Sequence, residues 1–218
     1  MGLGSISLTR SPLTYYKVQK AISWLVRGKR FLIPWARLHE RQYLNVGCGA
    51  NGNPVFVNLD YIRLPGVDVC WDLTRGPLPF PDAHFRGVYS EHCLDCIPST
   101  HARRQFREIY RVLKPGGIFR LVLPDGELYL DLYQKRKTDK SIVFPHGADE
   151  AMGMISINRY AREHTHQYSY DFELLDLWLR EAGFREVRRC AFGQGSDPDL
   201  VIDRPSRAIE SLYVEAVK

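Results

Sequence analysis

Four short apolar runs in the first half of this 218-residue sequence each end in glycine or polar residues. Glycine lets a backbone approach a ligand closely because it has no Cβ. A carboxylate can accept hydrogen bonds from neighbouring hydroxyls or from an exocyclic amine, which are groups that a nucleoside presents. We therefore predict a nucleoside-like ligand, provided that the fold brings the four run ends together. They are Gly47-Cys48-Gly49, Asp60, Asp72 and Ser90-Glu91-His92.

The runs that precede these residues are expected to be strands of one parallel sheet. Ligands of open parallel sheets bind beyond the carboxyl ends of the strands. Strands that alternate with helices favour an α/β fold with helices on both faces of the sheet. We predict strands at 43–46, 55–59, 67–71, 85–89 and 118–123, helices at 99–113 and 171–182, and a terminal hairpin of 187–192 and 211–217.

Gly47-x-Gly49-x-x-Gly52 matches the dinucleotide fingerprint, but its surroundings do not. That fingerprint needs a helix that starts at the glycines and an acidic residue about 20 positions further on. Asp60 comes too early, and Asn53-Pro54 leaves no room for a full helix before the next strand. We therefore expect a ligand without phosphates, rather than NAD, and an unusually short first crossover between parallel strands.

Several motifs together resemble a class I S-adenosylmethionine-dependent methyltransferase, over about residues 42–124 most strongly. More narrowly, they are similar to a compact bacterial group of methyltransferases associated with surface-polysaccharide biosynthesis. The resemblance implies a Rossmann-like, seven-stranded, mostly parallel sheet whose last strand is antiparallel. The motifs are Leu44-Asn-Val-Gly-Cys-Gly49, Asn58-Leu-Asp60, Trp71-Asp-Leu73, Val88-Tyr-Ser-Glu-His92 and Arg111-Val-Leu-Lys-Pro-Gly-Gly117.

The resemblance implies S-adenosylmethionine as the cofactor and assigns roles to the strand ends. As an alternative, Asp60 and Asp72 are turn residues, a frequent use of Asp after a strand. Relatives follow the Glu-His pair with a second one, where this sequence has Cys93-Leu-Asp-Cys96. By resemblance, Gly47, Cys48 and Gly49 lie under the methionine portion, Asp60 with Tyr61 holds the ribose, Asp72 with Leu73 faces the adenine, and Ser90, Glu91 and His92 line the floor near the methyl group.

Residues 125–170 interrupt the alternating pattern and are expected to form an insertion. They contain His146, His164 and His166. A hydroxyl acceptor needs a base to remove its proton, and histidine suits that role near neutral pH. We predict His166 as the base and His92 as the second candidate. The alternative is a structural role for His166, bonded to Asp171 or to a backbone carbonyl.

Residues 1–41 are a basic segment that precedes the methyltransferase-like domain at 42–218. This segment contains eight Lys or Arg residues and one Glu, so its net charge is +7. The remaining residues carry a net charge of −2, which gives the total of +5. Apolar residues at 15, 18, 22, 25 and 26 have the spacing of one helix face. We expect an amphipathic helix that contacts an anionic membrane or a phosphate-bearing acceptor. A solvated helix face is the alternative.

The cysteines do not indicate a metal or a disulfide framework. Cys93-x-x-Cys96 has no second pair, so we predict no bound metal. Five cysteines without a signal peptide are typical of a reducing compartment. No apolar stretch approaches the roughly 20 residues that a spanning helix requires. We expect a cytoplasmic protein with peripheral membrane contact through residues 1–41, and the sequence leaves its oligomeric state open.

These observations predict methyl transfer to a small-molecule or glycan-type acceptor, with a hydroxyl favoured. The alternatives are an RNA methyltransferase and a catalytically silent partner subunit. Nucleic acid is disfavoured because no basic patch interleaved with aromatic residues is present. The intact set of donor motifs disfavours the silent subunit.

Overall fold

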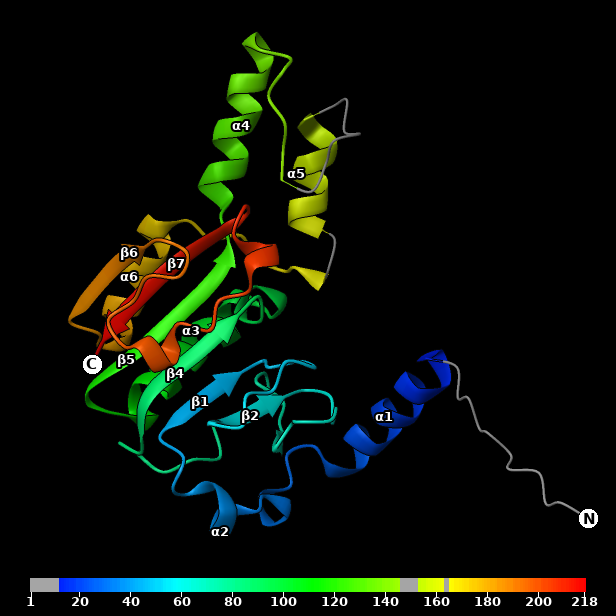
Figure 1. Ribbon diagram of the computed structural model, residues 1–218, viewed down its shortest axis with the longest axis vertical. Helices are drawn as coiled ribbons and strands as arrows, with labels where there is room; N and C mark the ends of the chain where they lie inside the picture. Colours follow the sequence, from blue (N-terminus) through cyan, green and yellow to red (C-terminus); the bar gives the residue numbers. More distant parts are fainter. Residues whose placement is uncertain (1–11, 146–152, 163–164) are drawn as a thin grey trace, which may run out of the picture.

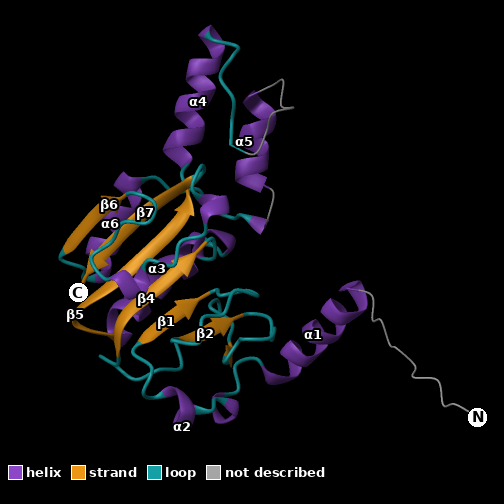
Figure 2. Ribbon diagram, in the orientation of Figure 1, coloured by secondary structure: helices purple, strands orange, loops and turns teal. Residues whose placement is uncertain are grey.

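The computed structural model describes residues 12–145, 153–162 and 165–218. Its strands form one seven-stranded sheet in the order β3-β2-β1-β4-β5-β7-β6 (Figures 1 and 2). Every neighbouring pair is parallel except those of β7, which runs antiparallel to both β5 and β6. The predicted Rossmann-like fold of class I methyltransferases is confirmed. The strands are β1 (Tyr43–Val46), β2 (Phe56–Asp60), β3 (Val69–Cys70), β4 (Phe85–Glu91), β5 (Leu113–Pro124), β6 (Glu186–Cys190) and β7 (Ser211–Val217).

The last helix begins and ends at residue types that commonly cap helices. The Asp171 side chain accepts a hydrogen bond from the Leu174 amide at 2.8 Å and caps the last helix. Gly183 ends that helix in the left-handed region, with φ of 112°. The α-helices are α1 (Pro12–Val26), α2 (Trp35–Leu38), α3 (Ser99–Val112), α4 (Gly126–Thr138), α5 (Gly153–Arg162) and α6 (Phe172–Ala182).

The main hydrophobic core lies on the sheet face that α3 and α6 cover. Alternate residues of each strand point to this face, because side chains of a strand alternate between its two sides. Phe106 and Ile109 of α3 and Phe119 of β5 have no exposed surface. Burying a side chain of this size contributes about 1.5–3 kcal/mol to folding. This core fixes the strands whose ends carry the predicted site.

The opposite face of the sheet is covered by residues 191–210, which contain the 3-10 helix η4 (Pro198–Leu200). The prediction of helices on both faces is therefore met by α-helices on one face and by this short 3-10 helix on the other. The connection between β1 and β2, residues 47–55, contains no helix, as predicted. Leu200 packs instead against a smaller cluster that includes Tyr43 and Phe56.

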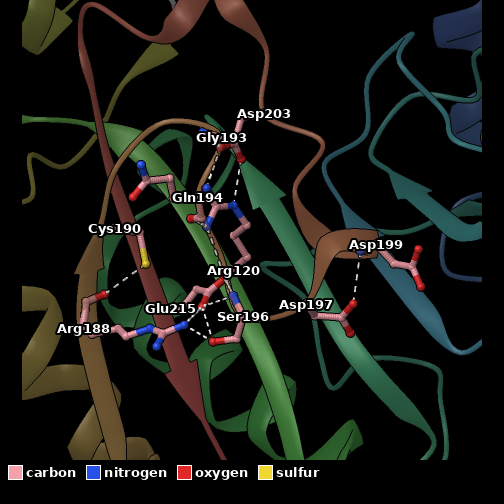
Figure 3. Close-up of polar contacts among 10 residues, drawn as sticks. All are labelled: Arg120, Arg188, Cys190, Gly193, Gln194, Ser196, Asp197, Asp199, Asp203 and Glu215. Atoms are coloured by element: carbon pink, nitrogen blue, oxygen red, sulfur yellow. Dashed lines mark hydrogen bonds and ion pairs between the residues drawn. The ribbon is translucent and has the colours of Figure 1, made fainter.

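A buried ion network holds the 191–210 segment to the sheet (Figure 3). Arg120 of β5 has no exposed side-chain surface and pairs with Asp203 at 2.8 Å and Glu215 at 3.2 Å. Burial alone would lower the pKa of Arg120, but the hydrogen bonds and charge of Asp203, with the charge of Glu215, raise it. Arg188 of β6 also pairs with Glu215, at 2.5 Å. The network links three adjacent strands to the covering segment.

The boundary between α3 and β5 differs most from the sequence prediction, whereas the other strand ends lie within two residues of it. The helix predicted at 99–113 ends at Val112, and β5 begins at Leu113 rather than at Ile118. The segment 114–117, expected to be a turn, is a bulge inside the sheet: Phe85 pairs with Leu113, whereas Gly87 pairs with Ile118. Gly116 accommodates the bulge with φ of 75°.

Two parts of the chain project from the sheet in Figure 1. α4 and α5 pack against each other and stand beyond the end of β5, within the predicted 125–170 insertion. α1 extends away from the β2 side of the sheet. Within the described residues, no helix is long and apolar enough to cross a membrane.

We predict that Arg120→Met lowers the free energy of unfolding by about 3–5 kcal/mol, because Asp203 and Glu215 would keep buried charges without their shared partner. Denaturant-induced unfolding measures the change. The matched control is Arg180→Gln, which breaks an exposed pair with Asp176 and should cost less than about 1 kcal/mol. Equal effects of the two substitutions would contradict the assignment.

Candidate functional site

The four predicted strand ends meet at one edge of the sheet. β1 pairs with β2 and with β4, and its last residue, Val46, is opposite both Leu59 and Ser90. β2 pairs with β3, which places Asp60 opposite Cys70. The carboxyl ends of β1, β2, β3 and β4 are therefore neighbours, as the sequence predicted. The site assignments below remain predictions, since no ligand tests them.

The Gly47–Gly49 turn requires both glycines. Gly47 and Gly49 have φ of 78° and 55°, a region that side chains disfavour. A Cβ on Gly47 would lie 2.3 Å from the Cys93 sulfur, so this glycine makes room for a neighbouring loop. A Cβ on Gly49 would meet nothing within 4 Å, so open space lies above this residue. Gly49 thus fits a position where a ligand approaches the backbone.

Asp60 already holds the turn beside it. Its carboxylate accepts hydrogen bonds from the Gly49 amide at 2.8 Å and from the Ile62 amide at 2.9 Å. This is the turn role that the sequence left as an alternative. Each carboxylate oxygen has two lone pairs, so the half-buried group can accept further hydrogen bonds. The Tyr61 ring is 52% exposed, and the Arg27 guanidinium lies 3.4 Å from its centroid.

Asp72, like Asp60, is both a turn residue and a predicted ligand-binding residue. It accepts from the Thr74 amide at 2.9 Å and from the Thr74 hydroxyl at 2.6 Å, and its second oxygen lies 3.2 Å from Arg75. Leu73 is buried in the main core. Asp72 therefore stabilises its own turn and is less available to a ligand than Asp60, because it is more buried and has three contacts, one of them with a guanidinium, against two for Asp60.

An ion pair that the sequence analysis missed closes the floor of the site. Arg204, from the 191–210 segment, donates to both oxygens of Glu91 through its backbone amide and its side chain. Glu91, Arg204, Gly47 and Cys48 line a cavity of only about 40 Å³. Burial, followed by the charge of Asp60, raises the pKa of the Cys48 thiol to about 12, so it is a neutral packing group. Arg204 lies more than 100 positions after Glu91, so no local spacing signals this pair.

His92 follows Glu91 in the left-handed region, with φ of 48°. Its Nε2 lies 2.8 Å from the Ser211 hydroxyl. Burial, together with the nearby charge of Arg207, lowers the pKa of His92 to about 3. At neutral pH His92 is therefore an uncharged imidazole. Ser90, one of the predicted floor residues, is buried and its hydroxyl has no hydrogen-bond partner within the described structure.

His166 reaches the strand-end edge from the far side of the 125–170 segment. Its Nδ1 is 2.7 Å from the Tyr160 carbonyl, which matches the predicted alternative of a backbone carbonyl partner. Its Nε2 is 3.2 Å from Asp95, whereas Asp171 is occupied as a helix cap. Asp95 lies in the 3-10 helix η2 (Leu94–Cys96), just after β4. His146 and His164 lie outside the described residues.

Asp95 is the second residue that the sequence analysis missed. It is 1% exposed, burial raises its pKa, and its Oδ1 has no hydrogen-bond partner in the described structure. The sequence predicted no role for Asp95, although it is the residue of Cys93-Leu-Asp-Cys96 that contacts His166. Its backbone carbonyl also accepts from the Gln167 amide at 2.7 Å, which fixes the approach of the His166 segment.

Among the described residues, one group has the donors of a metal site. Ligand atoms of Asp95, Cys96 and His166 lie within 4.8 Å of one another. Zinc sites use such donors, with four ligands in structural sites and three plus an open position in catalytic ones. Here Nε2 of His166 lies 3.2 Å from the Asp95 carboxylate, so the two groups can share one proton. The group therefore suits the holding of a proton without a metal, and the predicted absence of a metal stays a prediction.

Comparisons with known proteins agree with this geometry. Residues 62–121 match a protein family described as a methyltransferase domain. No curated protein sequence matches the chain. Solved methyltransferases from Thermotoga maritima and Archaeoglobus fulgidus, both S-adenosylmethionine-dependent, share its fold. The first has 16% identity and a TM-score of 0.51, over 94% of each chain. The second has 15% identity and a TM-score of 0.52, over 94% of this chain and 99% of the other.

A third similar structure contains a donor product. The phosphoethanolamine N-methyltransferase 2 of Haemonchus contortus, solved with S-adenosylhomocysteine, has 16% identity and a TM-score of 0.50, over 87% of this chain and 52% of that one. The domain match covers residues 62–121, and the solved structures show that the chain shares the fold of S-adenosylmethionine-dependent methyltransferases. The residues present fit that donor, because Gly49 leaves open space and the Asp60 carboxylate beside it keeps free lone pairs.

We predict that Asp60→Ala weakens binding of S-adenosylhomocysteine by roughly 1–3 kcal/mol, the cost of losing a hydrogen-bonded carboxylate. Isothermal titration calorimetry measures the affinity. The control is Asp82→Ala. Asp82 is an exposed aspartate in the loop before β4, and it pairs with Arg111. An affinity unchanged from the parent would remove Asp60 from the donor site.

A second prediction concerns the stability of the fold in acid. The pKa of His92 is about 3 in the folded chain and near 6.5 in an unfolded chain. The unfolded state therefore binds more protons between pH 6.5 and 3, and stability falls as the pH falls through this window, by at most about 1.4 kcal/mol per pH unit. His92→Gln should flatten this slope relative to the parent in unfolding experiments at pH 7 and pH 5. A slope equal to the parent's would show that His92 is not buried as a neutral group.

Proposed function

We propose that this protein is an S-adenosylmethionine-dependent methyltransferase that methylates a hydroxyl of a small-molecule or glycan-type acceptor. The observation that carries the proposal is the Asp95–His166 pair at the carboxyl end of β4. A hydroxyl must lose its proton during transfer, and a positioned base contributes about 10²–10⁴-fold to the rate. A pair that can take up one proton beside the predicted methyl position supplies that base.

The ring contacts of His166 select its basic atom. Nδ1 faces a carbonyl oxygen, which only accepts hydrogen bonds, so Nδ1 carries a proton. In the neutral ring Nε2 then holds the lone pair, and it faces the Asp95 carboxylate. When Asp95 is ionised, two acceptor atoms face each other across 3.2 Å, and uptake of a proton relieves this repulsion. The acceptor hydroxyl is the proposed source of that proton.

The Asp95 contact leaves room for the acceptor to compete. Charge-assisted nitrogen–oxygen hydrogen bonds are usually about 2.7–2.9 Å long, so the 3.2 Å contact of His166 with Asp95 is a long one. The Tyr160 contact, at 2.7 Å, is the shorter of the two and holds the ring in place. Nε2 can therefore exchange Asp95 for an acceptor hydroxyl while Nδ1 stays fixed.

An aromatic surface next to His166 supports a glycan-type acceptor. Tyr168 is 37% exposed and stacks on Trp178 at a centroid distance of 5.5 Å. Such rings combine a large apolar face with a polar edge, a combination that suits the alternating apolar and hydroxyl surfaces of a sugar. The sequence resemblance to methyltransferases associated with surface-polysaccharide biosynthesis points to the same acceptor class.

The test asks whether His166 removes the proton of the acceptor hydroxyl. We expect His166→Ala to lower kcat by about 10²–10⁴-fold, with little change in the affinity for the donor product. Asp95→Asn, which keeps the shape but not the charge, should lower kcat and alter its pH dependence. Activity is followed by transfer of a radiolabelled methyl group to fractionated bacterial glycans and their precursors.

His39→Ala, at the exposed histidine that follows α2, is the matched control and should retain the parent's turnover. A His166→Ala enzyme that turns over like the parent would exclude this histidine as the base. Label that is transferred only to nitrogen acceptors, or to RNA, would exclude the hydroxyl acceptor.

A further inference from the structure

The apolar stripe of α1 faces away from the protein. Val18, Ile22 and Leu25 lie on one side of the helix and are 39%, 39% and 55% exposed. The buried position is a polar one: Ser23 has no exposed surface, and its hydroxyl accepts a hydrogen bond from the Arg63 amide at 2.7 Å. A surface helix normally turns its apolar stripe to the core. In α1 this orientation is reversed.

Three more exposed apolar side chains lie in α1 and in the segment that follows it. Trp24 is 75% exposed, and Phe31 and Leu32 of the 3-10 helix η1 (Arg30–Leu32) are 81% and 49% exposed. Exposed apolar side chains gathered in this way usually mark an interaction site. We call this set the α1–η1 surface: Val18, Ile22, Trp24, Leu25, Phe31 and Leu32.

Basic residues surround the α1–η1 surface. Among the described residues, no ion pair with a carboxylate is formed by Lys17, Arg27, Lys29, Arg30 or Arg37. Arg27 contacts the Tyr61 carbonyl and ring instead, and Arg30 lies over the Trp71 ring at 5.9 Å. The positive charge of this region is therefore not neutralised locally. The residues are Lys17, Arg27, Lys29, Arg30 and Arg37.

We propose that the α1–η1 surface docks on an anionic lipid bilayer. Helices that lie in a membrane interface combine exposed apolar side chains with a basic polar face, and both parts add to binding. The charges disfavour a symmetric contact between two copies of the chain, because the basic residues would face each other. The aliphatic Val18, Ile22, Leu25 and Leu32 disfavour a nucleic acid, whose binding uses basic and aromatic groups.

Docking would bring the strand-end edge of the sheet close to the bilayer. Trp24 lines a pocket of about 430 Å³ together with Arg30, Trp71 and Asp72. Asp72 belongs to the predicted donor site, so the α1–η1 surface adjoins that site directly. This inference goes beyond the proposed function, because lipid binding can be measured without donor or acceptor.

The test is flotation of the full chain with vesicles of phosphatidylcholine, alone or mixed with phosphatidylglycerol. We expect binding to the mixed vesicles at low salt, weak binding to phosphatidylcholine alone, and release as salt screens the lipid charge. Binding should also shift the fluorescence of Trp24 to shorter wavelength. Trp24→Phe should remove that shift while the chain still floats with the vesicles.

Two double variants separate the contributions of charge and apolar contact. Lys29→Glu with Arg30→Glu should weaken binding to the mixed vesicles roughly 20-fold or more, at about fivefold for each positive charge lost. Phe31→Ser with Leu32→Ser should weaken it at least roughly tenfold. The controls are Arg107→Glu, at an exposed arginine of α3, and Leu177→Ser, at an exposed leucine of α6. Both controls should bind like the parent.

Three outcomes would overturn the proposal. The first is absence of binding to the mixed vesicles at low salt by a chain that still binds S-adenosylhomocysteine. The second is RNA binding that the Lys29/Arg30 variant abolishes, without vesicle binding. The third is a dimer, seen by sedimentation, that the Phe31/Leu32 variant dissociates without any vesicle binding by the parent. None of them bears on the hydroxyl acceptor, which is tested by label transfer in the absence of vesicles.

Discussion

The absence of a helix between β1 and β2 is the constraint on which the rest of the structure depends. Parallel neighbours are normally joined by a crossover of a dozen residues or more, usually through a helix that covers one face of the sheet. Residues 47–55 make this connection as a loop, which leaves that face without an α-helix. Apolar and charged side chains of the face must then be covered by something else. Residues 191–210 take that place, and the buried Arg120 holds them there.

The covering segment also reaches the candidate site. It carries Arg204 to Glu91, so the element that replaces a missing helix closes the cavity next to Gly47. The site therefore joins parts that are far apart in the sequence: a glycine turn, a loop after β4, a histidine beyond α5 and an arginine before β7. The pairing of the strands in the sheet and the ion network around Arg120 bring these parts together.

Local sequence patterns predicted most of the scaffold. Tyr43–Val46, Phe85–Glu91 and the capped helix after Asp171 follow from apolar runs and stop signals, and the structure contains them close to the predicted bounds. The bulge at 114–117 could not be predicted, because Lys-Pro-Gly-Gly is compatible both with a turn and with a bulge, and the choice depends on pairing with Phe85 and Gly87.

The polar partners in the site were harder to predict than the strand ends. Asp60 and Asp72 were recognisable because each ends a strand, yet the turn contacts that occupy them depend on backbone amides that sequence alone does not position. Asp95 and Arg204 were missed because their partners lie on distant segments. His166 was recognised by residue type alone, and its contact with Asp95 depends on how the 125–170 segment returns to the sheet.

The pairing of Arg120 directly opposite Glu215 has a consequence for how the antiparallel strand is aligned. Side chains of a strand alternate between faces, so a shift of β7 by one residue would move every side chain to the other side. Glu215 would then enter the apolar core among Phe119 and Leu121, while Val214 would face the guanidinium. Misaligned pairing would thus separate the Glu215 carboxylate from Arg120 and bury it among apolar side chains. The ion pair therefore disfavours any slip of β7 on β5 by one residue.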